Sequence, residues 1–147
     1  MSLEQWTNNS WLVEEEPTKS EIQQLRAVVD RALADANVKG LSADARYMLA
    51  YDVGLTLCSI CLRASGYRAA KGAGHHKRTI ESLVFTLGDS ARAVSDEIEL
   101  ASRLRGQAMY DRVDVVQETD VEQLIETVTE LRDQVTDWLL RNHPTLC

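Results

Sequence analysis

Proline and glycine, the residues that most often interrupt helices, are scarce in this chain. Two prolines and seven glycines occur among its 147 residues, and Pro17 and Pro144 lie near the two ends. The body of the chain therefore contains little that would break long helices. No segment shows sustained alternation of apolar and polar residues, so a fold rich in β-strands is disfavoured.

Cysteines and long apolar runs are also few. The three cysteines are Cys58 and Cys61, in an apolar stretch, and Cys147 at the end, which is not the pattern of a disulfide framework. We expect no apolar run near the roughly 18 residues that a membrane span needs. Residues 1–6 lack the basic and apolar regions of a signal peptide. A cytoplasmic protein without membrane association is therefore expected.

Positive charge is outnumbered by negative charge. Sixteen Lys and Arg residues against 23 Asp and Glu residues give a net charge of −7. Such a protein repels polyanions as a whole, so any nucleic-acid site must be a local patch. Apolar residues make up 44% of the chain and charged residues 27%, which excludes extensive disorder. The length favours a single domain over residues 1–147.

Five segments carry apolar residues at every third or fourth position, the spacing of an amphipathic helix. Thr18 and Ser42 are suited to cap the first two of them. We predict helices over residues 18–40, 42–66, 78–87, 89–111 and 119–142, and a loop over residues 67–76. The second helix is apolar on most sides and is expected at the centre. Residues 1–17, with Trp6 and Trp11, are expected to dock on an all-α, up-and-down bundle of four to five helices.

Charge is unevenly spread along the chain. No acidic residue occurs between Asp52 and Glu81, whereas residues 114–130 contain no Lys or Arg. The acidic stretch is predicted to be a solvated helix face. The basic stretch surrounds a glycine-containing loop and has the cations to bind phosphate or RNA. Its candidate binding residues are Arg68, His75, His76, Lys77 and Arg78. A solvated loop of chance basic character is an equal alternative.

The segment Cys58-Ser59-Ile60-Cys61 matches a C-x-x-C pattern, and His75 and His76 follow it. Adjacent histidines do not have the spacing of zinc ligands, and a second cysteine pair is missing. We therefore interpret both cysteines as small apolar residues of the core. No metal site and no cofactor are predicted.

Arg105 borders the apolar stripe of the fourth predicted helix, one helical step after Ala101. A cation in that position needs a partner. One interpretation is a salt bridge, with Asp52 on the central helix as the candidate. The other is phosphate binding, with Tyr110 as a hydrogen-bond donor or proton shuttle. Spacing alone favours neither.

Several short motifs occur in order along nearly the whole chain. They include Ala50-Tyr51-Asp52, Gly66-Tyr67-Arg68, Gly74-His75-His76 and Asn142-His143-Pro144. In this arrangement the chain resembles the HEPN domain family (higher eukaryotes and prokaryotes nucleotide-binding), in particular stand-alone bacterial members. The resemblance implies a bundle of four or five helices, commonly a homodimer. It also implies metal-independent endoribonuclease activity, often in toxin-antitoxin or defence systems.

The resemblance places the family's R-x-R-N-x-x-x-Y-D stretch on Arg103, Arg105, Gly106, Tyr110 and Asp111. Arg105 and Tyr110 then become the catalytic candidates, with Arg103 as a phosphate contact. Tyr110 stands where the family usually has His, and Gly106 replaces a polar residue. A tyrosine with a pKa near 10 is a poor base at neutral pH, so binding survives these changes better than catalysis. His75 and His76 are candidates to supply the titrating group, if the loop folds over the site.

Two functions remain open. One is a module that binds RNA or nucleotide phosphates and, if an enzyme, cleaves RNA without metal. The other is a non-catalytic interaction module for a partner such as a nucleotidyltransferase or an antitoxin. The acidic composition and Gly106 favour the second. The basic stretch favours the first, provided that it shares one surface with Arg105.

Overall fold

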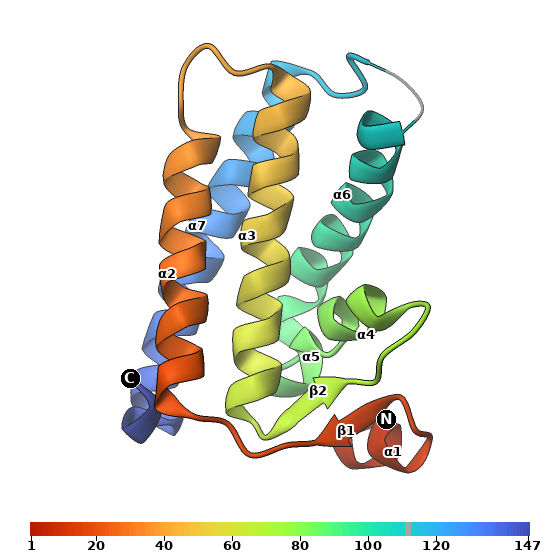
Figure 1. Ribbon diagram of the computed structural model, residues 1–147, viewed down its shortest axis with the longest axis vertical. Coiled ribbons are helices and arrows are strands. Elements are labelled where there is room, and N and C mark those ends of the chain that lie inside the picture. The colour runs from red at the N-terminus through yellow and green to blue at the C-terminus, as the bar shows by residue number, and fades with distance from the viewer. Residues whose placement is uncertain (111–112) are drawn as a thin grey trace.

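A computed structural model describes residues 1–110 and 113–147, apart from the side chains of residues 108–110. The protein is mostly helical, as predicted for the all-α class (Figure 1). The long helices are α2 (Lys19–Ala36), α3 (Ala43–Ala64), α6 (Arg92–Tyr110) and α7 (Glu118–Asn142). The shorter elements are α1 (Leu3–Asn8), β1 (Leu12–Glu14), β2 (Tyr67–Ala69), α4 (His75–Glu81), α5 (Leu83–Thr86) and 3₁₀ turns at Asp89–Ala91 and Pro144–Leu146.

Capping residues explain where the long helices begin. The Thr18 hydroxyl accepts a hydrogen bond from the Glu21 amide at 3.1 Å, and the Ser42 hydroxyl accepts one from the Ala45 amide at 3.1 Å. Both predicted starts are confirmed. The predicted end of the first helix at Gly40 is wrong, because α2 stops at Ala36.

Two further predicted boundaries are corrected. The last helix begins one residue before Thr119, because Gln117 and Asp120 form the capping box. The predicted short helix over residues 78–87 begins earlier, at His75, and is divided at Ser82. The Ser82 hydroxyl donates to the Thr79 carbonyl at 2.7 Å, a local side-chain bond that competes with helix continuation.

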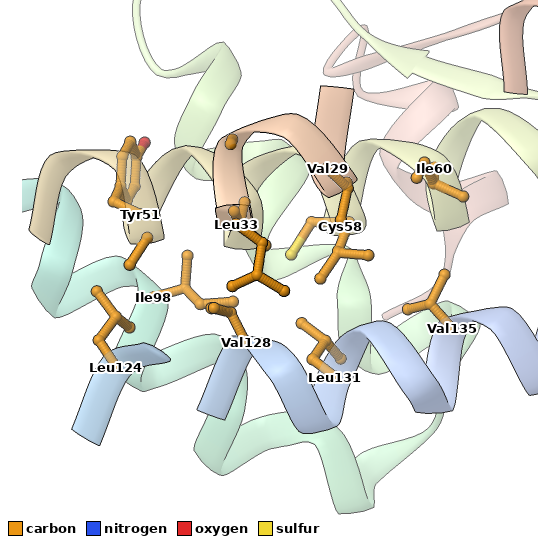
Figure 2. Close-up of a cluster of buried hydrophobic side chains, with 14 of the residues drawn as sticks. Val29, Leu33, Tyr51, Cys58, Ile60, Ile98, Leu124, Val128, Leu131 and Val135 are labelled. Carbon is orange, nitrogen blue, oxygen red and sulfur yellow. The ribbon is translucent and has the colours of Figure 1, made fainter. Parts of the chain in front are cut away.

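The central position predicted for the second helix is confirmed, since α3 packs against α2, α6 and α7. Figure 2 shows the core that these helices share; its labelled members include Val29, Leu33, Ile98, Val128 and Leu131. Gly54 lets the backbones approach closely. A Cβ atom there would lie 3.1 Å from the Ile98 side chain and 3.3 Å from Val128.

Helix α3 is long and apolar enough to cross a membrane by length and composition alone, so the expectation that no run approaches that length was too strong. The α2, α6 and α7 helices cover it, and 56% of its most apolar window is buried. A core helix apolar on most sides meets the same criterion. The structure is compatible with a soluble protein.

The N-terminal segment docks on the bundle, as predicted. Trp6 is buried against Phe85, with ring centroids 5.0 Å apart. Strands β1 and β2 pair antiparallel, with Leu12 opposite Ala69 and Glu14 opposite Tyr67. This pair was not predicted, because strands of three residues are too short to show alternation.

Candidate phosphate-binding site

Arg105 lies where α6 crosses the central helix. Its Nε atom is 3.6 Å from Oδ1 of Asp52 on α3, and its guanidinium carbon is 5.5 Å from the Tyr51 ring centroid. Of the two interpretations of Arg105, the salt bridge to Asp52 is therefore present in the structure. Both side chains are partly exposed, at 31% for Arg105 and 42% for Asp52, so solvent weakens the ion pair.

The Arg105 guanidinium also has an unmet donor. Its Nε atom is buried and has no hydrogen-bond partner in the part of the chain that the structure describes. The separation of 3.6 Å from Asp52 is too long for a hydrogen bond. A buried donor without an acceptor is costly.

His76 completes a three-residue group with Asp52 and Arg105. It lies in the first turn of α4, which packs against α3 and α6. The next residue, Lys77, forms a 3.9 Å ion pair with Glu99 of α6. His76 is close enough to Asp52 and Arg105 for both charges to act on its pKa. We call Asp52, His76 and Arg105 the Asp52 group.

Two members of the Asp52 group, Asp52 and His76, have shifted pKa values. Partial burial lowers the pKa of His76, and the His75 and Arg105 charges lower it further, whereas Asp52 opposes them. The two histidine rings lie 4.0 Å apart. Burial raises the pKa of Asp52, and the Arg105 and His76 charges oppose that rise. At neutral pH these shifts favour a neutral imidazole beside a guanidinium.

The remaining basic residues are divided between surfaces. The Arg78 guanidinium carbon lies 3.6 Å from the Trp11 ring centroid, and Arg68 Nε is 3.5 Å from Glu15 Oε2. Both therefore contact the N-terminal segment. Arg103 is exposed on α6. It precedes Arg105 by two residues, which places the two side chains about 200° apart around the helix. Of the predicted residues, His76 interacts electrostatically with Arg105, His75 lies against His76, and Lys77 pairs with Glu99 of α6.

Two further predicted positions, Gly106 and Tyr110, lie in the second half of α6. The Tyr110 side chain lies outside the described residues. Gly106 is part of α6, and a Cβ atom there would meet nothing within 4 Å. Packing therefore does not require glycine at the position where the resembling family has a polar residue.

The two cysteines of α3 are core residues, as predicted. Cys58 and Cys61 are fully buried, and burial raises the pKa of Cys61 to about 12. A thiol in this state is a poor nucleophile and metal ligand. Among residues 1–110 and 113–147, no cluster of three or more His, Cys, Asp or Glu side chains is placed to hold a metal ion.

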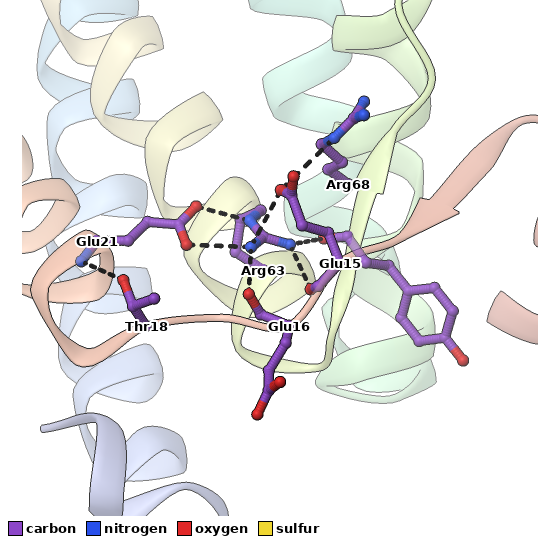
Figure 3. Close-up of polar contacts among 7 residues, drawn as sticks. Glu15, Glu16, Thr18, Glu21, Arg63 and Arg68 are labelled. Carbon is purple, nitrogen blue, oxygen red and sulfur yellow. Dashed lines mark hydrogen bonds and ion pairs between the residues drawn. The ribbon is translucent and has the colours of Figure 1, made fainter.

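Arg63 has a structural role that its place in the basic stretch did not indicate (Figure 3). It is 6% exposed. Its Nε donates to Glu21 Oε1 at 2.7 Å, and its Nη1 donates to the Glu15 and Tyr67 carbonyls at 3.0 and 3.1 Å. In the sequence, the one feature that could have indicated this structural role was an arginine inside an otherwise apolar helix. Arg63 thus ties the N-terminal segment to α2 and α3.

The described geometry is that of a helical protein with a partly exposed Arg105–Asp52 pair. No family model matches the chain, and searches of curated proteins and of solved structures also found no match. Function is therefore inferred from the residues around Arg105.

Proposed function

We propose that the protein is a HEPN-like helical module that binds RNA or nucleotide phosphates through Arg105. The observation that carries this proposal is the partly exposed Arg105 guanidinium, which lies 3.6 Å from Asp52, too far for a hydrogen bond. Phosphate offers two oxygen acceptors in the geometry that a guanidinium prefers. Asp52 holds the Arg105 side chain only weakly, so an anion competes for it.

The surroundings of Arg105 support a local site in an acidic protein. His75, His76 and Lys77 are exposed at the start of α4, and the loop before them contains Gly72 and Gly74. Lys77 adds a cation there, and the loop adds backbone amides that can meet an anion. The resemblance to the HEPN family extends the proposal to a cytoplasmic homodimer of toxin-antitoxin or defence type. Metal-independent RNA cleavage is then the class of reaction.

RNA binding by matched arginine variants tests the proposal. Wild type, Arg105→Ala and the control Arg103→Ala are titrated with a fluorescent single-stranded RNA, with EDTA present. A charge-assisted contact contributes about 1.5–3 kcal/mol, so Arg105→Ala should weaken binding roughly 10-fold to 100-fold. Arg103→Ala, on the far side of α6, should bind within roughly threefold of wild type. Equal binding by Arg105→Ala and wild type would refute the role of Arg105.

One observation favours the non-catalytic alternative. Glu118, Glu122, Glu126 and Glu130 are exposed on α7, as predicted for the acidic stretch, and this face suits a basic protein partner. Such a partner would be a nucleotidyltransferase or an antitoxin. Absence of RNA binding by the wild type in the same titration would favour this alternative.

A further inference from the structure

A small cavity of about 110 Å³ lies between α2, α3 and α7. Its floor consists of apolar side chains that are at most 2% exposed: Val29 of α2, Leu57 and Ile60 of α3, and Val135 and Leu139 of α7. Figure 2 shows three of them, Val29, Ile60 and Val135, on the three helices. The cavity therefore has a wholly apolar, deeply buried floor.

The size and the floor of this cavity suit a short aliphatic chain. Side chains that face a void lose dispersion contacts, and an alkyl group placed there restores those contacts as it leaves water. Apolar cavities of roughly 150 Å³ bind a molecule as large as benzene. A cavity of about 110 Å³ thus has room for a smaller chain, of about four to six carbons.

The rim of the cavity carries two arginines, Arg26 of α2 and Arg132 of α7, and one carboxylate, Asp30. Arg132 Nη1 lies 3.9 Å from Asp30 Oδ1, and Arg132 Nε lies 3.7 Å from Asp133 Oδ1. Both distances are too long for a hydrogen bond. Arg26 is partly buried, and its side chain has no ion pair or hydrogen bond with any residue that the structure describes. Two guanidinium groups therefore have donors available beside the apolar floor.

We propose that this cavity binds an aliphatic carboxylate of about four to six carbons. The alkyl chain lies on the floor, and the carboxylate accepts hydrogen bonds from Arg26 and Arg132. A carboxylate has the planar pair of oxygens that matches a guanidinium. Because the two arginines outnumber Asp30 at the rim, the site favours an anion over a cation. The cavity shares no residue with the Asp52 group, so this inference does not depend on RNA binding.

Titration of the wild type with hexanoate tests the proposal, with the valine and leucine methyl groups followed by NMR. Hexanoate should shift the methyl signals of Val29, Val135 and Leu139, with a Kd of about 1 mM or tighter. Three comparison ligands separate the chain from the charge. Acetate has the charge without the chain, hexanol has the chain without the charge, and hexylamine has the chain with the opposite charge. Each should bind at least roughly fivefold more weakly than hexanoate.

Matched arginine variants locate the carboxylate. Arg26→Gln should weaken hexanoate binding roughly 5-fold to 10-fold, because a partly exposed charge-assisted contact is lost, and should leave hexanol binding unchanged. The control Arg31→Gln removes the same charge from an exposed position on α2 and should bind hexanoate like wild type. Val135→Leu extends a side chain into the cavity and should weaken both hexanoate and hexanol. If Val135→Leu does not fold, the comparison of Arg26→Gln with Arg31→Gln still decides.

Three results would overturn the inference. One is the absence of methyl shifts at the cavity up to about 10 mM hexanoate. Another is equal affinity for hexanoate and hexanol, which would show an apolar cavity that does not select an anion. The third is equal hexanoate affinity in Arg26→Gln and Arg31→Gln. None of these results bears on Arg105, and RNA binding that does not depend on Arg105 would leave the cavity proposal intact.

Discussion

At the scale of single residues, arginine has two roles in this protein, and burial separates them. Arg63 is buried and donates to a carboxylate and to backbone carbonyls. Arg105 is partly exposed, and its one carboxylate neighbour lies beyond hydrogen-bond distance. Replacing Arg63 would leave buried acceptors without a hydrogen bond, whereas replacing Arg105 would break only a weak ion pair. Stability should therefore depend on Arg63 and ligand binding on Arg105.

Arg63→Ala tests this division. Loss of one partner from a buried, hydrogen-bonded ion pair should lower the free energy of unfolding by about 3 kcal/mol. The control is Arg92→Ala, which removes an exposed 3.0 Å pair with Asp89 and should cost about 0.5 kcal/mol or less. Urea denaturation measures both. Equal losses would show that the Arg63 cluster contributes no more than a surface pair.

The same cluster predicts a pH dependence of stability. The hydrogen bond from Arg63 lowers the pKa of Glu21 below its usual 4.5. Because the folded-state pKa is depressed, the stabilisation is fully present above the unfolded pKa and is lost as the pH falls through the folded one. Thermal denaturation should thus show a fall in Tm on acidification below about pH 4.5. Glu21→Gln should be less stable at neutral pH, with a smaller acid dependence.

Two glycines in helices should respond oppositely to alanine. Gly106 has open space around its missing Cβ, so Gly106→Ala should stabilise by roughly 0.5–1 kcal/mol. A Cβ at Gly54 would crowd Ile98 and Val128, and overpacking of this kind costs about 1–3 kcal/mol. Gly54→Ala should therefore be less stable than wild type. Calorimetry of the two variants measures the change in Tm from wild type. Equal changes in Gly106→Ala and Gly54→Ala would contradict the close approach of α3 to its neighbours.

At the scale of elements, one carboxylate joins the link between α6 and α7 to the start of α3. Asp44 accepts hydrogen bonds from the amides of Asp114, Val115 and Val116 at 2.7, 3.1 and 3.3 Å. These bonds cross a large separation in sequence and place the start of α7. Charge-assisted bonds to backbone amides are stronger than neutral ones.

Asp44→Ala should therefore lower the free energy of unfolding by about 1–2 kcal/mol. Hydrogen exchange should speed up at the amides of residues 114–116, because their acceptor is gone. Asp35→Ala, at an exposed site on α2, is the matched control and should change neither quantity. Unchanged exchange in Asp44→Ala would contradict the bonding described.

At the scale of the whole molecule, the net charge is −7, and the cations near the candidate site, Arg105 and Lys77, each lie beside a carboxylate. Few phosphates can be contacted at once, since Arg68 and Arg78 already hold the N-terminal segment. The log of the RNA affinity should fall with log salt with a slope of roughly −0.7 per contacted phosphate, so about −1 to −2 overall. Titrations at several KCl concentrations measure it. A slope steeper than about −4 would indicate an extended basic surface instead.

Local chemistry made much of this structure predictable. Thr18 and Ser42 cap helices because their hydroxyls reach amides three residues away, which requires no tertiary contact. The apolar faces of the second segment predicted a central helix, and its cysteines were correctly assigned to the core. Helical geometry also placed Arg105 beside an apolar stripe, where a cation needs a partner, but left a salt bridge to Asp52 and phosphate binding as equal interpretations; the structure shows the pair with Asp52.

The amino-acid sequence by itself determined the helical class and most helix positions, because these follow from periodicity and capping within a few residues. Only the tertiary structure decided that β1 pairs with β2, that Arg63 is a buried anchor, and that Arg105 pairs with Asp52. Each of these depends on contacts between segments far apart in the chain. Burial, which decides whether a charge binds its own protein or a ligand, arises only when those segments pack together.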